Sequence, residues 1–155
     1  MSENPPVTWS WHTLQSLSSV ELHAVLSARS AVFVVEQTSI YQDPDTIDLE
    51  AWHLLGRAPD GALLAYARVT PPGSRFDEPS IGRVLTLPAA RGLGLGRDIV
   101  ARAVAKCIDA YAGMAIRISA QTYLIDFYGD FGFVSDGAVY DEDGIPHIEM
   151  VRAAD

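Results

Sequence analysis

Arg91-Gly-Leu-Gly-Leu-Gly96 is the stretch that decides the fold, because it places three glycines, with Arg97 beside them, between an expected strand and an expected helix. The apolar run over 81–87 predicts the strand, which Pro88 ends because proline has no N–H for a ladder. Apolar residues at helical spacing predict the helix over 98–112. A helix start favours an anion, and glycines let the backbone approach it closely. The stretch therefore predicts a phosphate-binding loop or, without a ligand, a simple strand-to-helix turn.

The spacing of the glycines decides which phosphate loop this is. A dinucleotide fingerprint would need glycine at 97 or 99, where the chain has Arg97 and Ile99. A nucleotide-triphosphate loop needs a Gly-Lys-Ser/Thr tail, and the sequence contains no such tripeptide. What remains is R-x-x-G-x-G, formed by Arg91, Gly94 and Gly96. This pattern resembles the acyl-CoA pyrophosphate loop of the GNAT superfamily of N-acyltransferases.

A second motif follows one helix and one strand later, over 119–133. It is similar to the superfamily pattern N-x-x-A-x-x-L/F-Y-x-x-x-G-F. Gln121 stands at the Asn position and Leu124 at the Ala position, while the matching residues are Phe127, Tyr128, Gly132 and Phe133. The resemblance implies that Gln121 hydrogen-bonds the pantetheine arm of the cofactor and that the Tyr128 hydroxyl lies near the thioester sulfur.

The resemblance extends over nearly the whole chain, from about Trp9 to Met150. The segments 32–37, 81–84, 120–121 and 142–147 together resemble the ElaA-like branch of the superfamily. The resemblance implies one GNAT-like domain over 1–155, with a mixed, mostly antiparallel, twisted sheet flanked by helices. Such a domain is classed as α/β or, by some classifications, α+β.

The local patterns predict the elements of this domain. Ser18 and Glu21 have the spacing of a capping box, which predicts a helix over Ser19–Arg29, and the next segment, 31–37, is either helix or bend. Pro59-Asp-Gly61 predicts the turn of a hairpin. The expected strands, apart from that of the loop, are 7–12, 51–58, 62–70, 115–119, 133–140 and 147–152.

Composition fits one enzyme-sized domain, because 155 residues with 48% hydrophobic content can bury a core without disulfides. Cys107 is the only cysteine, and its place on the apolar face of the helix predicts a buried thiol. With 11 basic and 20 acidic side chains, the net charge of −9 argues against nucleic acid as a partner. We expect residues 1–6 to be a disordered tail, and no leader or membrane-spanning run is visible. A cytoplasmic monomer or homodimer follows as the expectation.

The resemblance also implies a reaction, the transfer of an acetyl group from acetyl-CoA to an amine. The residues implied to hold acetyl-CoA are Leu85, Thr86 and Leu87 of the strand, Arg91, Gly92, Leu93, Gly94, Leu95, Gly96 and Arg97 of the loop, and Gln121 and Tyr128. The strand also supplies a backbone N–H for the oxyanion. Tyr128 is the expected acid, because a phenol stays protonated at neutral pH and can donate to a leaving thiolate. Packing within an aromatic cluster is the alternative for its role.

The base that deprotonates the amine has three candidates, Glu36, His53 and His147, and water is a fourth. Two acidic segments, 43–50 and 141–143, either line the mouth of the acceptor site or are simply solvated. Two other functions stay open: a noncatalytic acyl-CoA-binding or sensor domain, and an acyltransferase for longer acyl chains. No metal site is expected.

Overall fold

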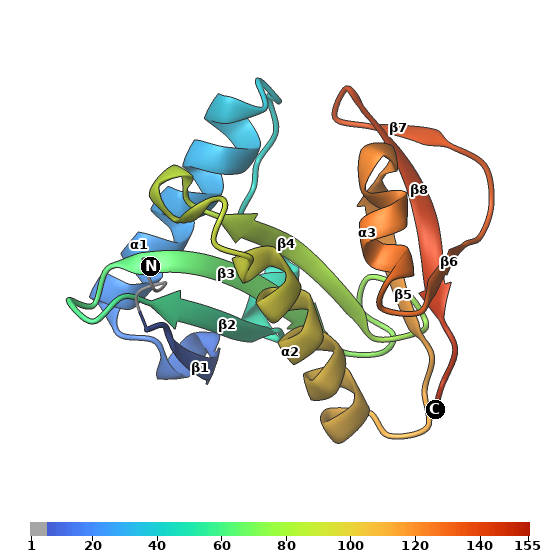
Figure 1. Cartoon of the computed structure of the whole chain (residues 1–155), viewed down its shortest axis with the longest axis horizontal. Helices are drawn as coiled ribbons and strands as arrows, with labels where there is room; N and C mark the ends of the chain where they lie inside the picture. The colour runs from blue at the N-terminus through green and yellow to red at the C-terminus, as the bar shows by residue number, and fades with distance from the viewer. Residues whose placement is uncertain (1–5) are drawn as a thin grey trace.

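Two antiparallel sheets and the helices packed on them make up the computed structural model, which describes residues 6–155 (Figure 1). The first sheet has the order β1-β2-β3-β4, formed by β1 (Thr8–Thr13), β2 (Trp52–Arg57), β3 (Leu63–Thr70) and β4 (Ser80–Thr86). The second has the order β5-β8-β6, with β7 also paired to β8; its strands are β5 (Ile116–Gln121), β6 (Phe133–Ser135), β7 (Tyr140–Glu142) and β8 (Ile145–Arg152). The longer helices are α1 (Ser19–Arg29), α2 (Leu95–Ala110) and the π-helix η2 (Ser30–Glu36), and α3 is short (Ile125–Gly129).

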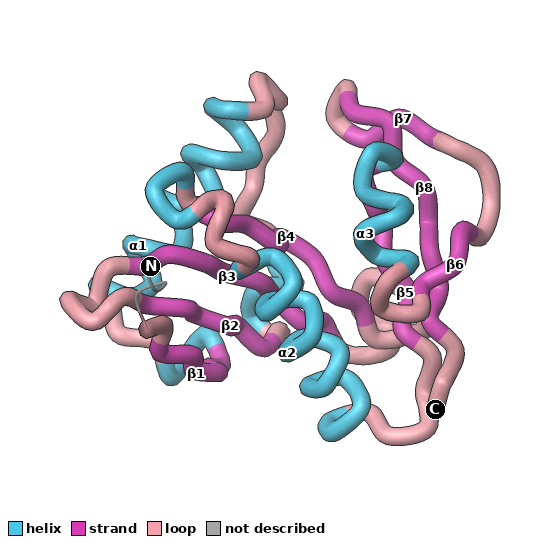
Figure 2. The backbone as a smooth tube through the Cα atoms, viewed as in Figure 1, coloured by secondary structure: helices cyan, strands magenta, loops and turns pink. Residues whose placement is uncertain are grey.

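The two sheets meet near the starts of β4 and β5. The Arg117 N–H of β5 donates to the Pro79 carbonyl just before β4, at 3.1 Å. Beyond that point the two strands diverge, and α3 lies beside β5 on the second sheet (Figure 2). Side chains from β4 and from β5 can therefore face the same space between the two sheets.

Opposite faces of the first sheet carry the two long helices. Successive strand residues point to opposite faces, so Leu54 and Leu55 of β2 belong to different clusters. Leu55 packs with Val25 and Ala28 of α1, whereas Leu54 packs with Leu95 and Ile99 of α2. The first sheet is thus covered by a helix on each face. Packing of Leu95 and Ile99 on one face fixes the position of the amino end of α2.

Basic side chains of α2 cover the tryptophans of β1 and β2. Arg102 lies over the Trp9 ring at 4.9 Å, and Lys106 lies over Trp52 at 3.8 Å and Trp11 at 5.3 Å. A cation against an aromatic face gains electrostatic stabilisation that a solvated side chain lacks. Arg102 and Lys106 therefore hold α2 against the edge of the first sheet and are not simply solvated side chains.

The predicted first helix is confirmed, and so is its cap: the Ser18 hydroxyl accepts from the Glu21 N–H, and the Glu21 carboxylate accepts from the Ser18 N–H. Segment 31–37 is helical rather than bent, although it is a π-helix. The helix after the glycine loop begins at Leu95, earlier than the sequence predicted. Residues 1–5 of the expected tail lie outside the described residues.

One predicted strand is wrong. Residues 133–140 do not form a continuous strand, because pairing to β8 stops after Ser135 and resumes at Tyr140. Gly137, between them, has φ of 106°, a left-handed conformation that a strand does not contain. The pairings between described strands are all antiparallel, so the mixed component of the expected sheet is not seen among them. No helix within residues 6–155 is long and apolar enough to cross a membrane.

Candidate functional site

The glycine loop turns the chain from β4 into α2 without a side-chain cap. Gly92 and Gly94 have φ of 82° and 75°, and Gly94 is the N-cap of α2. A Cβ added at either glycine meets nothing within 4 Å, so backbone conformation rather than crowding is what favours glycine there. The N-cap residue, Gly94, supplies no side-chain hydrogen bond to the first N–H groups of this 16-residue helix. They are left to an anion or to water.

Both arginines of the loop form exposed ion pairs. Arg91 holds Glu36 with two hydrogen bonds of 2.7 and 3.1 Å, and its Nε donates to the Thr86 carbonyl at 3.2 Å. Arg97 pairs with Asp130 at 2.9 Å. Exposed pairs are weak and exchange readily, so a phosphate can replace either carboxylate. Glu36 consequently lies at the loop, outside the two cavities described next.

Two cavities lie along β4, and we call them the apolar cavity and the polar cavity. The apolar cavity has a volume of about 270 Å³ and is lined by Val84, Leu85, Thr86, Gly96, Ile99, Leu124, Phe127 and Tyr128. The polar cavity, of about 220 Å³, has many more lining residues, among them Arg68, Thr70, Arg83, Gln121, Glu142 and His147. Val84, Leu124 and Tyr128 line both, so the two cavities adjoin at these three residues.

A bulge in β4 shapes the wall between the cavities. The register passes from Tyr66↔Leu85 to Arg68↔Gly82, so β4 has one more residue than β3 over this step. Arg83, within the bulge, has φ of 53°. A bulge leaves a residue outside the ladder and redirects its neighbours.

Ladder bonds limit which strand residues can bind a cofactor. The Leu87 N–H donates to the Leu64 carbonyl at 2.9 Å, so it is already used, contrary to its expected part as a free backbone donor. Opposing residues of an antiparallel pair alternate between bonded and non-bonded, so the register directs the N–H of Thr86 away from β3. Thr86 is thus the better placed of the two for a cofactor contact.

Tyr128 is buried, with 8% of its surface exposed, and its ring packs edge-on against Phe127 and Phe133. Within residues 6–155 no hydrogen bond to its hydroxyl is formed. Burial raises the pKa of Tyr128 to about 12, with a smaller contribution from Tyr123. Tyr128 therefore packs within the aromatic cluster and also lines both cavities, so its packing does not exclude a role as acid.

His147 and Glu142 face each other in the polar cavity. His147 Nδ1 lies 2.7 Å from the Ile145 carbonyl, which can only accept, so this nitrogen carries the proton and Nε2 is left facing Glu142 Oε2 at 3.3 Å. Glu142 also accepts from Arg75 at 2.8 Å and Ser119 at 3.3 Å. Burial alone would raise the pKa of Glu142, but the hydrogen bond and charge of Arg75 outweigh it and lower the pKa.

His53 does not reach either cavity. It is fully buried in β2, where Nδ1 lies 2.6 Å from the Tyr66 hydroxyl and Nε2 lies 3.0 Å from the Asp48 carbonyl. Burial lowers the pKa of His53, although the Asp48 carbonyl acts in the opposite sense. With both ring nitrogens engaged, His53 is a structural residue of the core, and the arrangement does not support a role as base.

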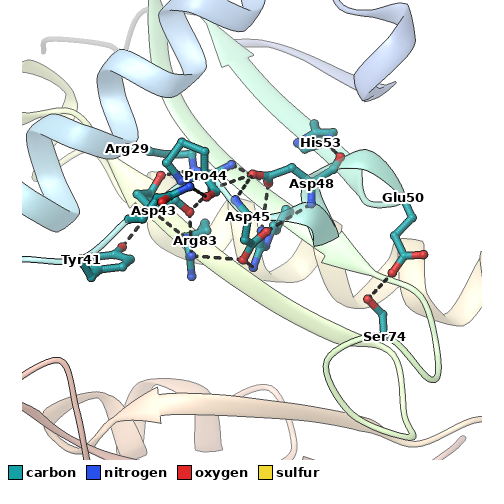
Figure 3. A network of polar contacts seen from close by, with 12 residues as sticks. Arg29, Tyr41, Asp43, Pro44, Asp45, Asp48, Glu50, His53, Ser74 and Arg83 are labelled. Carbon is teal, nitrogen blue, oxygen red and sulfur yellow. Dashed lines mark hydrogen bonds and ion pairs between the residues drawn. The ribbon is translucent and has the colours of Figure 1, made fainter.

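The acidic segment 43–50 is largely neither solvated nor at an acceptor mouth, which corrects both alternatives for it. Asp43 and Asp48 are buried and pair with Arg29 at 2.7 Å each (Figure 3). Asp48 and Asp45 also hold Arg68, at 2.9 and 2.6 Å. We call these five residues, with Arg83, the buried ion network. Glu50 lies apart, bound to Ser74.

Comparison with known proteins identifies the chain. The family model described as an acetyltransferase (GNAT) domain matches residues 24–154. The chain belongs to the GNAT acetyltransferase family. The UPF0039 protein sll0451 of Synechocystis sp. is 46% identical over 145 residues, covering 94% of each chain. Protein ElaA of Escherichia coli is 40% identical over 146 residues, covering 92% of this GNAT chain and 95% of ElaA.

Solved structures agree with this assignment. The crystal structure of an acyl-CoA N-acyltransferase from Pseudomonas aeruginosa matches with a TM-score of 0.90 and 41% identity, covering 96% of this chain and 100% of that one. The crystal structure of E. coli ElaA matches with a TM-score of 0.88 and 38% identity, covering 95% and 99%. The protein is therefore a GNAT-type acyltransferase of the ElaA-like branch, a family that uses acyl-CoA.

The sequence did not single out Arg68 and Thr70, which line the polar cavity of this GNAT domain, and it gave Glu142 no individual role. The sequence did contain a signal for Arg68 and Thr70. Arg68 and Thr70 are the polar residues of an otherwise apolar strand, and a charge in such a strand is retained only with a buried partner.

Proposed function

We propose that this chain transfers the acetyl group of acetyl-CoA to a primary amine by direct attack, with Tyr128 giving its proton to the leaving sulfur. One observation carries this function: Tyr128 lines both cavities. A thioester in the apolar cavity and an amine in the polar cavity would meet beside its hydroxyl.

The residues around the apolar cavity fit an acyl-CoA. The uncapped start of α2 with Gly94, Gly96, Arg91 and Arg97 suits the pyrophosphate, because backbone N–H groups and guanidinium groups both favour phosphate oxygens. Outward-facing backbone of Thr86 suits the amides of the pantetheine arm, which would add to β4 like a further strand. Gln121 lines the polar cavity, and its amide donates to the Gln37 side chain at 3.4 Å, a long bond that a pantetheine amide can replace.

The chemical step needs one proton to travel from nitrogen to sulfur. The amine nitrogen attacks the thioester carbonyl carbon, and an N–H of the bulged part of β4 stabilises the oxyanion. The C–S bond then breaks with its electron pair on sulfur, which takes the proton of the Tyr128 hydroxyl. The phenolate recovers a proton released by the new ammonium group, directly or through water and His147.

The acidity of the buried phenol supports this transfer. Burial raises the pKa of Tyr128 to about 12, so the hydroxyl is protonated at neutral pH and can donate as the leaving sulfur gains negative charge.

Of the three base candidates, His147 alone lines the acceptor side of the site. Glu36 is bound to Arg91, and His53 is enclosed in the core. We therefore propose His147, with water, for the removal of the amine proton. His147→Asn should lower kcat/KM more for amines that are ammonium ions at the assay pH than for weakly basic amines that are already neutral, and an equal loss for both would point to packing instead.

Replacing Tyr128 by Phe tests the main assignment. Release of CoA thiol from acetyl-CoA is followed across a panel of amines, and CoA affinity is measured by calorimetry. We expect turnover to fall about tenfold or more in Tyr128→Phe, with CoA affinity nearly unchanged. Full turnover at saturating substrates would refute the role of Tyr128. Wild-type protein that binds CoA but acetylates no amine would be a sensor domain, and acyl-CoA thioesters of increasing length test the acyl preference.

A further inference from the structure

The polar cavity gathers the unpaired polar atoms of the buried side chains. Within residues 6–155, three buried side-chain nitrogen or oxygen atoms have no hydrogen-bond partner: Arg68 Nε, Thr70 Oγ1 and Arg83 Nε. All three residues line the polar cavity. Buried polar groups are almost always paired, because leaving one unpaired is costly. Arg83 Nε has the Asp43 carboxylate beside it, so Arg68 Nε and Thr70 Oγ1 are the two atoms that point to a ligand as their partner.

Arg68 and Thr70 provide the firmer part of this site. Each is 1% exposed. Arg68 uses Nη1 and Nη2 on the carboxylates of Asp45 and Asp48, which fixes the guanidinium, while its Nε has no hydrogen-bond partner within residues 6–155. Arg83 Nε lies 2.9 Å from Asp43 Oδ1, close enough to attract the carboxylate but not aligned for a hydrogen bond. The Arg68 Nε–H can only donate, so its missing partner is an oxygen acceptor.

The strand geometry leaves room for that acceptor. Arg68 and Thr70 are two residues apart on β3 and so share one face of the sheet. Gly82 of β4 is the residue opposite Arg68. A Cβ added at Gly82 meets nothing within 4 Å, and Gly82 also lines the polar cavity. Gly82 therefore leaves open space in the polar cavity opposite Arg68.

The second sheet contributes the opposite chemistry. Glu142 of β7 and His147 of β8 line the same cavity, and the Glu142 carboxylate is an acceptor that attracts an ammonium group. Donors therefore come from β3 and β4, while a carboxylate comes from β7.

Acidic and basic side chains around the cavity nearly cancel. Arg29, Arg68 and Arg83 face Asp43, Asp45 and Asp48 in the buried ion network, Arg75 pairs with Glu142, and Asp143 adds one further carboxylate to the lining. A cavity with little net charge but with separate donor and carboxylate walls best fits a ligand that carries both charges. A polyamine or a doubly charged phosphate would leave excess charge in a buried space.

We infer that the acceptor is a small zwitterion, an amine that also carries a carboxylate, with its carboxylate toward Arg68 and Thr70 and its amino group toward Glu142 and Tyr128. This inference rests on the proposed function for the reaction, but not for the binding of the carboxylate. The volume of about 220 Å³ suits a molecule of amino-acid size rather than a folded protein.

Matched acceptor pairs test the carboxylate. Alanine, β-alanine and 4-aminobutyrate are each compared with the corresponding carboxamide, which has the same shape but no negative charge, in the CoA thiol assay at saturating acetyl-CoA. For the best pair we expect kcat/KM at least about tenfold higher for the carboxylate, the effect of one charge-assisted hydrogen bond. Carboxamides that react equally well or better would overturn the inference and leave the proposed function intact.

Binding of products gives a readout that needs no turnover. N-acetylated acids and their amides are added to the protein with CoA, and the thermal midpoint is measured. Selective stabilisation by the acid supports the carboxylate-binding part of the site even if no amine is acetylated, in which case only the proposed function fails. Equal stabilisation by acid and amide overturns the site.

Two variants locate the site in the cavity. Thr70→Val removes the free hydroxyl at nearly constant volume, and Thr70→Ser keeps it as the matched control. We expect the preference for carboxylate over carboxamide to fall about threefold or more in the Val variant and to persist in the Ser variant. Gly82→Val fills the open space, so KM of the acceptor should rise about tenfold while KM of acetyl-CoA stays within about twofold. An unchanged preference in Thr70→Val, together with an unchanged acceptor KM in Gly82→Val, would refute the placement.

Discussion

Replacing Asp48 by Asn should strongly destabilise the protein. Asp48 Oδ1 accepts from Arg29 at 2.7 Å and Arg68 at 2.9 Å, and Oδ2 accepts from Arg29 and the Asp45 N–H at 3.1 Å each. Asparagine has the same size as aspartate, but it replaces one carboxylate oxygen by an NH2 group that faces other donors. The substitution also leaves positive charge of the buried arginines uncompensated. Breaking a buried pair on one side costs about 3–5 kcal/mol. For a chain of this size the thermal midpoint should fall by about 6–20 °C.

The pH dependence of this loss separates charge from packing. Burial alone would raise the pKa of Asp48, but hydrogen bonds from Arg29 and the charges of Arg29 and Arg68 outweigh it and lower the pKa from 3.8 to about 2. A depressed pKa means stability that is present above about pH 4 and is lost as the pH falls toward 2. That contribution is about 2 kcal/mol. The difference between wild type and Asp48→Asn should therefore shrink by about 2 kcal/mol over this range.

Chemical denaturation followed by circular dichroism measures both quantities, with Asp77→Asn as the matched control. Asp77 is exposed, and no ion pair of its side chain occurs within residues 6–155. The control should change the unfolding free energy by less than about 0.5 kcal/mol. A loss below 1 kcal/mol in Asp48→Asn, or a loss that is constant from pH 7 to pH 2, would refute the reasoning about charge.

Three further outcomes are expected. Glu36→Gln removes the carboxylate that pairs with Arg91, so CoA affinity measured by calorimetry at low salt should improve about two- to fivefold; weaker binding would mean that Glu36 helps to hold the cofactor. Gly94→Ala puts a Cβ on a residue with φ of 75°, so the unfolding free energy should fall by about 1–2 kcal/mol in denaturant titrations, and an unchanged value would show that the loop relaxes. Burial raises the pKa of Cys107 to about 12, so an aromatic disulfide reagent should label it only after unfolding, whereas fast labelling of the native protein would contradict its burial.

Local patterns explain what the sequence could predict. The Ser18 cap and the glycine loop depend on residues within one turn, so they can be read directly from spacing. The interruption after Ser135 had a local signal, because Asp136-Gly137 is typical of a turn, and the backbone leaves the extended region at this glycine. The family pattern added Tyr128, which periodicity alone would assign to the aromatic core.

The ion network shows why the rest could not be predicted. Asp43 and Asp48 looked like members of an exposed acidic loop, since nothing near them in the sequence is basic. Their partners, Arg29 and Arg68, come from α1 and β3, and only the tertiary fold brings these elements to the loop. The same limit applies to the polar cavity, whose donors and carboxylate come from different sheets.

The placement of the tryptophans has a practical consequence for ligand screening. All three, Trp9, Trp11 and Trp52, lie against basic side chains of α2, and none lines the polar or the apolar cavity. Intrinsic fluorescence therefore reports chiefly on this helix and its contact with the sheet edge. A cofactor that binds at the start of α2 should alter the tryptophan emission, whereas an acceptor in the polar cavity should leave the emission nearly unchanged. Optical titrations can thus follow the two substrates separately, with the second detected by an extrinsic label or by heat.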